Sequence, residues 1–206
     1  MTDTNQSAIR RSEPAIDWNV PSLRGGFRGM LDRAFGPGYS QAEFYLQTIV
    51  PIIGALTVPV LASTLHMPWT LAQQAVAAFL ALDGIGGVIT NSTSSGKRWF
   101  HRETATARQH LAFATSHLAH FALIAWVFTE ASLGWFLGAS AYLIAAAPLV
   151  IYAPLHIQRP VSAALIAFGT IFSLQLLPQI PGMQWVLPVF YMKLLGAHLT
   201  REEPYR

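Results

Sequence analysis

Residues 107–128 read ARQHLAFATSHLAHFALIAWVF, and this stretch indicates the class of fold. Its only Lys, Arg, Asp or Glu side chain is Arg108, near the start. A helix of about 20 mainly apolar residues crosses a hydrocarbon core of about 30 Å. The stretch therefore predicts a membrane-spanning helix, although it contains histidines at positions 110, 117 and 120.

The composition of the whole chain also indicates a membrane protein. Of its 206 residues, 52% are hydrophobic and only 11% are charged, whereas a soluble domain carries about 25% charged residues. The chain has no cysteine, which excludes disulfides, thiolate metal ligands and thiol nucleophiles.

Six apolar stretches predict the architecture. They run over residues 44–65, 68–90, 106–128, 134–155, 160–177 and 183–199. Because only helices or closed barrels satisfy the backbone in lipid, we expect an all-α integral membrane protein, with six transmembrane helices formed by residues 41–200. The last two stretches are short and only PQIPG (178–182) separates them. Five spans, or a re-entrant sixth segment, therefore fit the pattern as well.

The positions of the basic residues predict the orientation. If the N-terminus is cytoplasmic, all 13 Lys and Arg residues lie on the inner side or at an inner helix end. This positive-inside bias predicts that both termini are cytoplasmic. Lys193, inside the last stretch, is expected to extend its side chain toward the inner surface. We expect a multi-pass protein of the bacterial cytoplasmic (inner) membrane.

Two segments lie outside the predicted bundle: residues 1–40, a cytoplasmic arm, and residues 201–206, a short cytoplasmic tail. In the arm, apolar residues recur at helical spacing between Val20 and Phe35, with arginines between them. This pattern is typical of a basic helix on the membrane surface, which the sequence GPG at 36–38 would end. A disordered arm is the alternative, and the adjacent glycines at 25 and 26 favour it.

The three histidines of 107–128 share one helix face. At 100° per residue, His110 and His117 project about 20° apart, and His120 projects about 60° from His117. Ionisable groups within a membrane are costly and usually face a bundle interior or a cavity. One interpretation is a metal site, and the other is hydrogen bonding that holds neighbouring helices together.

Asp83 is the acidic residue that lies well inside a predicted span. The glycines at 84, 86 and 87 permit close approach of another helix, and the short connection after the second span predicts that Asp83 lies beside the third. The carboxylate can ligate a metal, carry a proton or orient a ligating histidine. The alternative is a structural salt bridge to Arg108. With His156 from another helix, the predicted metal ligands are His110, His117, His120, Asp83 and His156.

The segment NSTSSGKRWFHR at 91–102 combines hydroxyl groups with cations. Lys97, Arg98 and Arg102 are candidates for binding an anion or a lipid headgroup. The alternative is a basic loop that serves only to set the topology.

These features lead to three functional hypotheses. The first is a membrane enzyme or redox protein that depends on iron, zinc or manganese, or on haem, and acts on a lipophilic substrate from the bilayer. The second is a small proton- or cation-coupled transporter. The third is an assembly subunit without chemistry of its own. The expected partners are the lipid bilayer and a lipophilic small molecule, with no nucleic acid, and the sequence does not set the oligomeric state.

Overall fold

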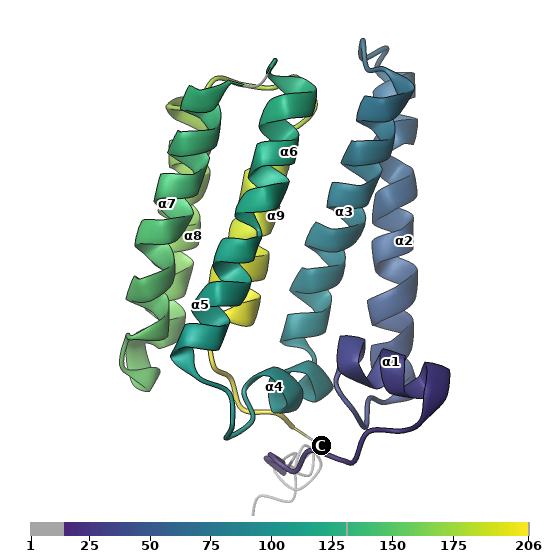
Figure 1. The fold of residues 1–206 in the computed structure, drawn as a ribbon, viewed down its shortest axis with the longest axis vertical. Coiled ribbons are helices and arrows are strands. Elements are labelled where there is room, and N and C mark those ends of the chain that lie inside the picture. Colours follow the sequence, from purple (N-terminus) through teal and green to yellow (C-terminus); the bar gives the residue numbers. More distant parts are fainter. Residues whose placement is uncertain (1–14, 131, 206) are drawn as a thin grey trace, which may run out of the picture.

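The computed structural model describes residues 15–130 and 132–205, and this part of the chain is helical apart from one isolated β-bridge. Five stretches form helices that are long and apolar enough to cross a membrane. They are α2 (Gln41–Thr64), α3 (Leu71–Ser92), α5 with α6 (Ala107–Ser116 and Leu118–Phe128), α7 (Leu133–Ile151) and α8 (Leu155–Gln175). The prediction of a helical protein with membrane-length apolar helices is confirmed (Figure 1).

The starts of these helices follow from local sequence. In each of α2, α3 and α5, the hydroxyl of an N-cap Ser or Thr accepts a hydrogen bond from the backbone N–H three residues later. The side chain of that later residue accepts a hydrogen bond from the backbone N–H of the N-cap residue. This capping box satisfies backbone N–H groups that have no partner within the helix. The pairs are Ser40 with Glu43, Thr70 with Gln73, and Thr106 with Gln109.

The sixth predicted stretch forms a shorter helix. It consists of α9 (Val186–Tyr191), which continues as a π-helix, η2 (Met192–His198). At 1.5 Å per residue this segment is about 20 Å long, which is less than a hydrocarbon core. The residues before it, 176–185, form no long helix and connect it to α8.

The short α9–η2 segment is the core of the bundle. It contacts α3, α7 and α8, and in Figure 1 it lies behind α5 and α6. Its apolar side chains are almost completely buried, and they include Val186, Phe190, Tyr191, Leu194 and Leu195. Helices α3, α5, α7 and α8 therefore contact this short segment, whereas α2 packs against the outer side of α3.

The two ends of the described chain meet at one end of the bundle, here called the terminal end. Ile16 pairs with Tyr205 in the isolated bridge, and the Asp17 N–H donates to the Pro204 carbonyl at 2.9 Å. Helices α1 (Gly26–Phe35) and α4 (Ser94–Phe100) also lie at this end (Figure 1). Helix α1 covers the second half of the expected basic helix and ends at Gly36, whose φ is 82°.

Helix α1 is anchored through an ion pair between Asp32 and the exposed side chain of Arg24. Asp32 is buried, and both the backbone N–H and the guanidinium of Arg24 donate to its carboxylate. These hydrogen bonds from Arg24 hold the pKa of Asp32 below its usual value. Phe27 and Met30 are exposed on the same short helix, so its apolar side is free to face a membrane surface.

Candidate metal centre

The third membrane-length stretch is broken at His117, where α5 ends and α6 begins. Three consecutive side chains at the break form hydrogen bonds with backbone carbonyls of the preceding turn. Thr115 donates to the Leu111 carbonyl at 2.9 Å, and Ser116 donates to the Phe113 carbonyl at 2.7 Å. His117 Nδ1 also binds the Phe113 carbonyl, at 2.8 Å. Such side-chain to backbone bonds compete with regular helix formation, and three of them meet in the turn where α5 ends.

The break places two histidines beside a carboxylate of α3. Asp83, His117 and His120 each offer one ligand atom, and these atoms lie within 4.8 Å of one another. We call these three residues the Asp83 group. Because the His117 Nδ1–H donates to a carbonyl, its Nε2 carries the lone pair that a metal requires. His120 Nε2 lies 3.5 Å from Asp83 Oδ2.

Aromatic contacts hold the two imidazoles in place. The rings of His117 and His120 stack with centroids 5.0 Å apart, and the ring of Phe79 stacks on His120 at 5.6 Å. Phe190 of the central helix contacts both.

Ligand atoms around a tetrahedral zinc ion are about 3.3 Å apart, given metal–nitrogen bonds of about 2.0 Å. Binding a metal therefore requires the widest of the separations between ligand atoms to shorten by about 1.5 Å.

Lys193 of η2 completes this site. Its Nζ lies 2.6 Å from Asp83 Oδ2, and the lysine side chain is buried. The lysine side chain passes over Gly87, where an added Cβ would overlap it. The expectation that Lys193 extends toward the inner surface is therefore wrong. The alternative of a salt bridge to Arg108 is also replaced, because the cation that pairs with Asp83 is Lys193.

The Asp83 group lies at the side of the bundle rather than at its centre. The side chains of Asp83 and His120 are 31% and 20% exposed. Phe79 and Leu82, on the same helix as Asp83, are also exposed. If α3 and α6 span a bilayer, this opening faces hydrocarbon.

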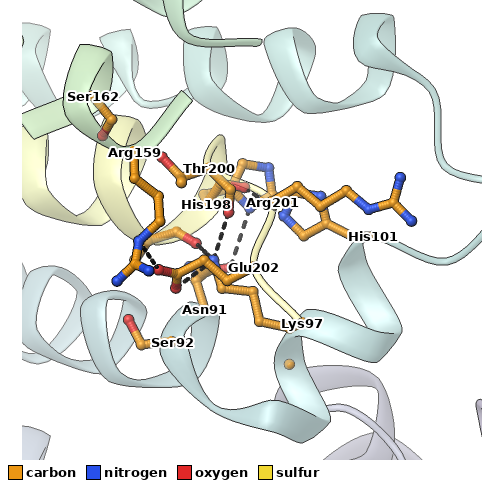
Figure 2. A network of polar contacts seen from close by, with 12 residues as sticks. Asn91, Ser92, Lys97, His101, Arg159, Ser162, His198, Thr200, Arg201 and Glu202 are labelled. Carbon is orange, nitrogen blue, oxygen red and sulfur yellow. Dashed lines mark hydrogen bonds and ion pairs between the residues drawn. The ribbon is translucent and has the colours of Figure 1, made fainter. Parts of the chain in front are cut away.

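His110 lies in a different group, here called the histidine cluster, which also contains His101, His198 and Asn91. His110 Nδ1 lies 3.2 Å from His198 Nε2, and His198 Nδ1 lies 3.1 Å from the side-chain oxygen of Asn91. His101 Nε2 donates to the His198 carbonyl at 2.9 Å (Figure 2). Burial lowers the pKa of His101 to about 3, so its imidazole is neutral at pH 7.

The three cations of the 91–102 segment are divided among different environments. Lys97 is 2% exposed, and its ammonium donates to the carbonyls of Ala197 and Thr200 at 2.7 and 2.6 Å (Figure 2). It thereby caps the end of the central helix, where carbonyls lack partners within the helix. Burial lowers its pKa to about 8. Arg98 is buried, and Arg102 lies over the Trp99 ring at 4.4 Å.

The structure thus brings together three of the five predicted metal ligands. Asp83, His117 and His120 form one group, His110 joins the histidine cluster, and His156 lines a cavity at the terminal end. Sequence reasoning did not connect Lys193 with Asp83. The signal was available, because a charged residue inside a predicted span was the criterion that singled out Asp83.

Comparisons with protein-family models, with curated proteins and with solved structures give no match to this chain.

Proposed function

We propose that this protein is a membrane metalloprotein in which Asp83, His117 and His120 bind one iron, zinc or manganese ion that acts on a lipophilic substrate. The observation that carries the proposal is the convergence of two imidazoles and a carboxylate, with ligand atoms within 4.8 Å, at a mostly buried position in an apolar bundle. Two histidines with one carboxylate form a recurrent ligand set for iron and zinc.

A bare ion suits this group better than haem. The two imidazoles belong to one helix and stack on each other, and the nearby carboxylate can bind the same ion. Haem iron takes its ligands along an axis perpendicular to a large flat ring. Phe79, Phe190 and Lys193 occupy the space around the imidazoles in which such a ring would have to lie.

Three protein ligands leave coordination positions free, as in catalytic rather than structural metal sites. The free positions would lie on the side where Asp83 and His120 are exposed, between α3 and α6. A substrate reaching that side from a bilayer must be soluble in hydrocarbon and must carry an atom that can approach the metal. We therefore infer a lipophilic substrate with a polar reactive group, at which the metal activates water, oxygen or the substrate itself.

We further propose that the terminal end faces the cytoplasm of a bacterial cell. Helices α1 and α4 at that end carry arginines and Lys97, as the positive-inside rule requires. Reporter fusions after Gly96 should then report inside, and fusions at Met67 and Glu130 should report outside. A fusion after Gly96 that reports outside would reverse this orientation.

Metal analysis tests the central proposal. Protein purified without chelators and reloaded with iron, zinc or manganese is expected to retain about one ion per chain. Asp83→Asn, His117→Gln and His120→Gln should each weaken metal binding by at least about 10-fold. His110→Gln is the matched control, because it makes the same change on the same apolar stretch outside the group. A wild-type protein that binds no metal, or equal metal contents in all four variants, would refute the proposal.

The ion pair between Lys193 and Asp83 favours a second candidate function, proton- or cation-coupled transport. The ammonium is a cation tethered to the chain, and a transported proton or cation would compete with it for the same carboxylate. Liposomes that contain the protein provide the test. A proton or cation flux that Asp83→Asn abolishes, in protein without stoichiometric metal, would favour the transporter over the metalloprotein.

A further inference from the structure

A cavity at the terminal end lies apart from the Asp83 group. It measures about 600 Å³ and lies among α4, the start of α8 and the C-terminal segment. Its charged lining consists of Lys97, Arg159, Arg201, Glu202 and Glu203. Three cations face two carboxylates, which leaves one net positive charge, and Trp18 and Tyr205 add aromatic surface.

The cations of this cavity already converge on a carboxylate of the same chain. Glu202 lies 3.1 Å from Arg159 Nε and 3.5 Å from Lys97 Nζ (Figure 2). The Arg159 side chain is 76% exposed, so its other nitrogens remain open to solvent. The position of Glu202 shows where an anion is stabilised in this cavity.

A second cavity of about 290 Å³ adjoins the first. The two share Ser92, Arg159 and Glu202 in their linings. From there the second cavity runs between α3 and α8 as far as Val88 and Ile166. Ile166 lies seven residues beyond Arg159 on α8, which is about 10 Å along the helix. This groove is lined mainly by apolar atoms of Val88, Ala163, Ile166, Met192, Gly196 and Ala197.

We propose that these joined cavities bind one anionic phospholipid from the leaflet at the terminal end. The phosphate headgroup would lie beside Arg159, and an acyl chain would lie in the groove between α3 and α8. A polar, positively charged space that opens into an apolar groove along two helices complements an anionic amphiphile. The guanidinium group of Arg159 suits phosphate oxygens, and Leu155 and His156, at the start of α8, also line the headgroup cavity.

Glu202 has a defined role in this proposal. Its carboxylate occupies the anion position when no lipid is bound, so the lipid phosphate must displace it or bind beside it. The proposal does not depend on metal binding, because none of the residues that line the two cavities belongs to the Asp83 group.

Native mass spectrometry of the detergent-solubilised protein tests the proposal, with dioleoyl phosphatidylglycerol, dioleoyl phosphatidylcholine and inorganic phosphate as separate probes. One phosphatidylglycerol should bind about 10-fold more tightly than phosphatidylcholine. Arg159→Gln should remove most of this preference, whereas Glu202→Gln should strengthen phosphatidylglycerol binding several-fold, since it removes the internal competitor. Arg108→Gln is the matched control, because it removes an exposed cation that lines neither cavity.

Ala163→Phe distinguishes a lipid from free phosphate. Ala163 is exposed and lines only the groove, so the larger side chain should weaken phosphatidylglycerol binding without changing the affinity for inorganic phosphate. Equal binding of the two lipids, or equal effects of Arg159→Gln and Arg108→Gln, would overturn the proposal. Phosphate binding as tight as that of phosphatidylglycerol, with no effect of Ala163→Phe on either, would overturn the assignment to a lipid. Unchanged metal content in Arg159→Gln would show that the two sites are separate.

Discussion

The Asp83 group and the histidine cluster use the same residue type in opposite ways. In the histidine cluster, neutral imidazoles bond to one another, to Asn91 and to a backbone carbonyl. In the Asp83 group, His120 Nδ1 has no partner within the described residues, and a carboxylate and an ammonium lie beside the rings. Hydrogen bonds fix the imidazoles of the histidine cluster to one another, whereas the two stacked imidazoles of the Asp83 group lie beside a charged pair.

The largest effect should follow from removing the charge of Asp83. Asp83→Asn leaves the Lys193 ammonium in the bundle without its carboxylate, which we expect to lower the free energy of unfolding by about 3 kcal/mol. Asn91→Ala removes a neutral hydrogen bond from the histidine cluster and should lower it by only about 1 kcal/mol. Denaturant unfolding in detergent micelles measures both.

The double variant Asp83→Asn with Lys193→Met controls for this interpretation. Because it removes both charges, it should recover most of the lost stability. If it is no more stable than Asp83→Asn alone, the ion pair is not the source of the loss.

The next effect distinguishes the two groups by pH. The pKa of His101 in the folded protein is about 3, below its usual 6.5, because burial disfavours the charged imidazole and the cations of Lys97 and Arg201 lie nearby. Between these two values the unfolded chain binds more protons, so stability falls as pH is lowered. Lowering the pH from 6.5 to 4.5 should remove about 2–3 kcal/mol. His101→Gln should flatten this dependence in thermal unfolding curves, and an unchanged curve would assign it to other groups.

A smaller effect concerns competition at Asp83. Lys193→Met removes the tethered cation, so we expect it to raise the apparent metal affinity about tenfold, or by about 1.4 kcal/mol. His198→Gln changes the histidine cluster instead and should leave the affinity unaltered. Isothermal titration calorimetry with zinc measures the metal affinities of both variants. A lower affinity in Lys193→Met would mean that the lysine orients the carboxylate for the metal rather than competing with it.

The smallest effect comes from a single methyl group. Gly87→Ala places a Cβ in the path of Lys193, and the displaced ammonium should reduce stability by about 1 kcal/mol. At the adjacent Gly86 an added Cβ would meet Pro51 at an ordinary distance of 3.4 Å. Gly86→Ala should therefore be close to neutral in the same unfolding assay. Equal effects of the two substitutions would show that the space over Gly87 is not specific to the lysine.

Local sequence predicted the long helices because length and hydropathy are properties of one segment. It also predicted that Asp83 lies near the third span, since a short connection joins the two stretches. The interruption at His117 falls inside one continuous apolar stretch, and no apolar pattern reveals it. The pairing of Asp83 with Lys193, 110 positions later in the chain, depends on how separate helices pack, and a pattern within one segment does not contain that information.

The central position of α9–η2 has a consequence for how the protein is made. The ribosome delivers the five long helices first, and the segment that fills the space among them emerges only afterwards. Until then Asp83 has no Lys193 to neutralise it, and the carbonyls that Lys97 caps do not yet exist. Insertion of the final helix thus closes the bundle, neutralises its buried charge and ties down the terminal end in a single late event. Nascent chains that stop before Val186 should therefore be the form that membrane proteases recognise and degrade.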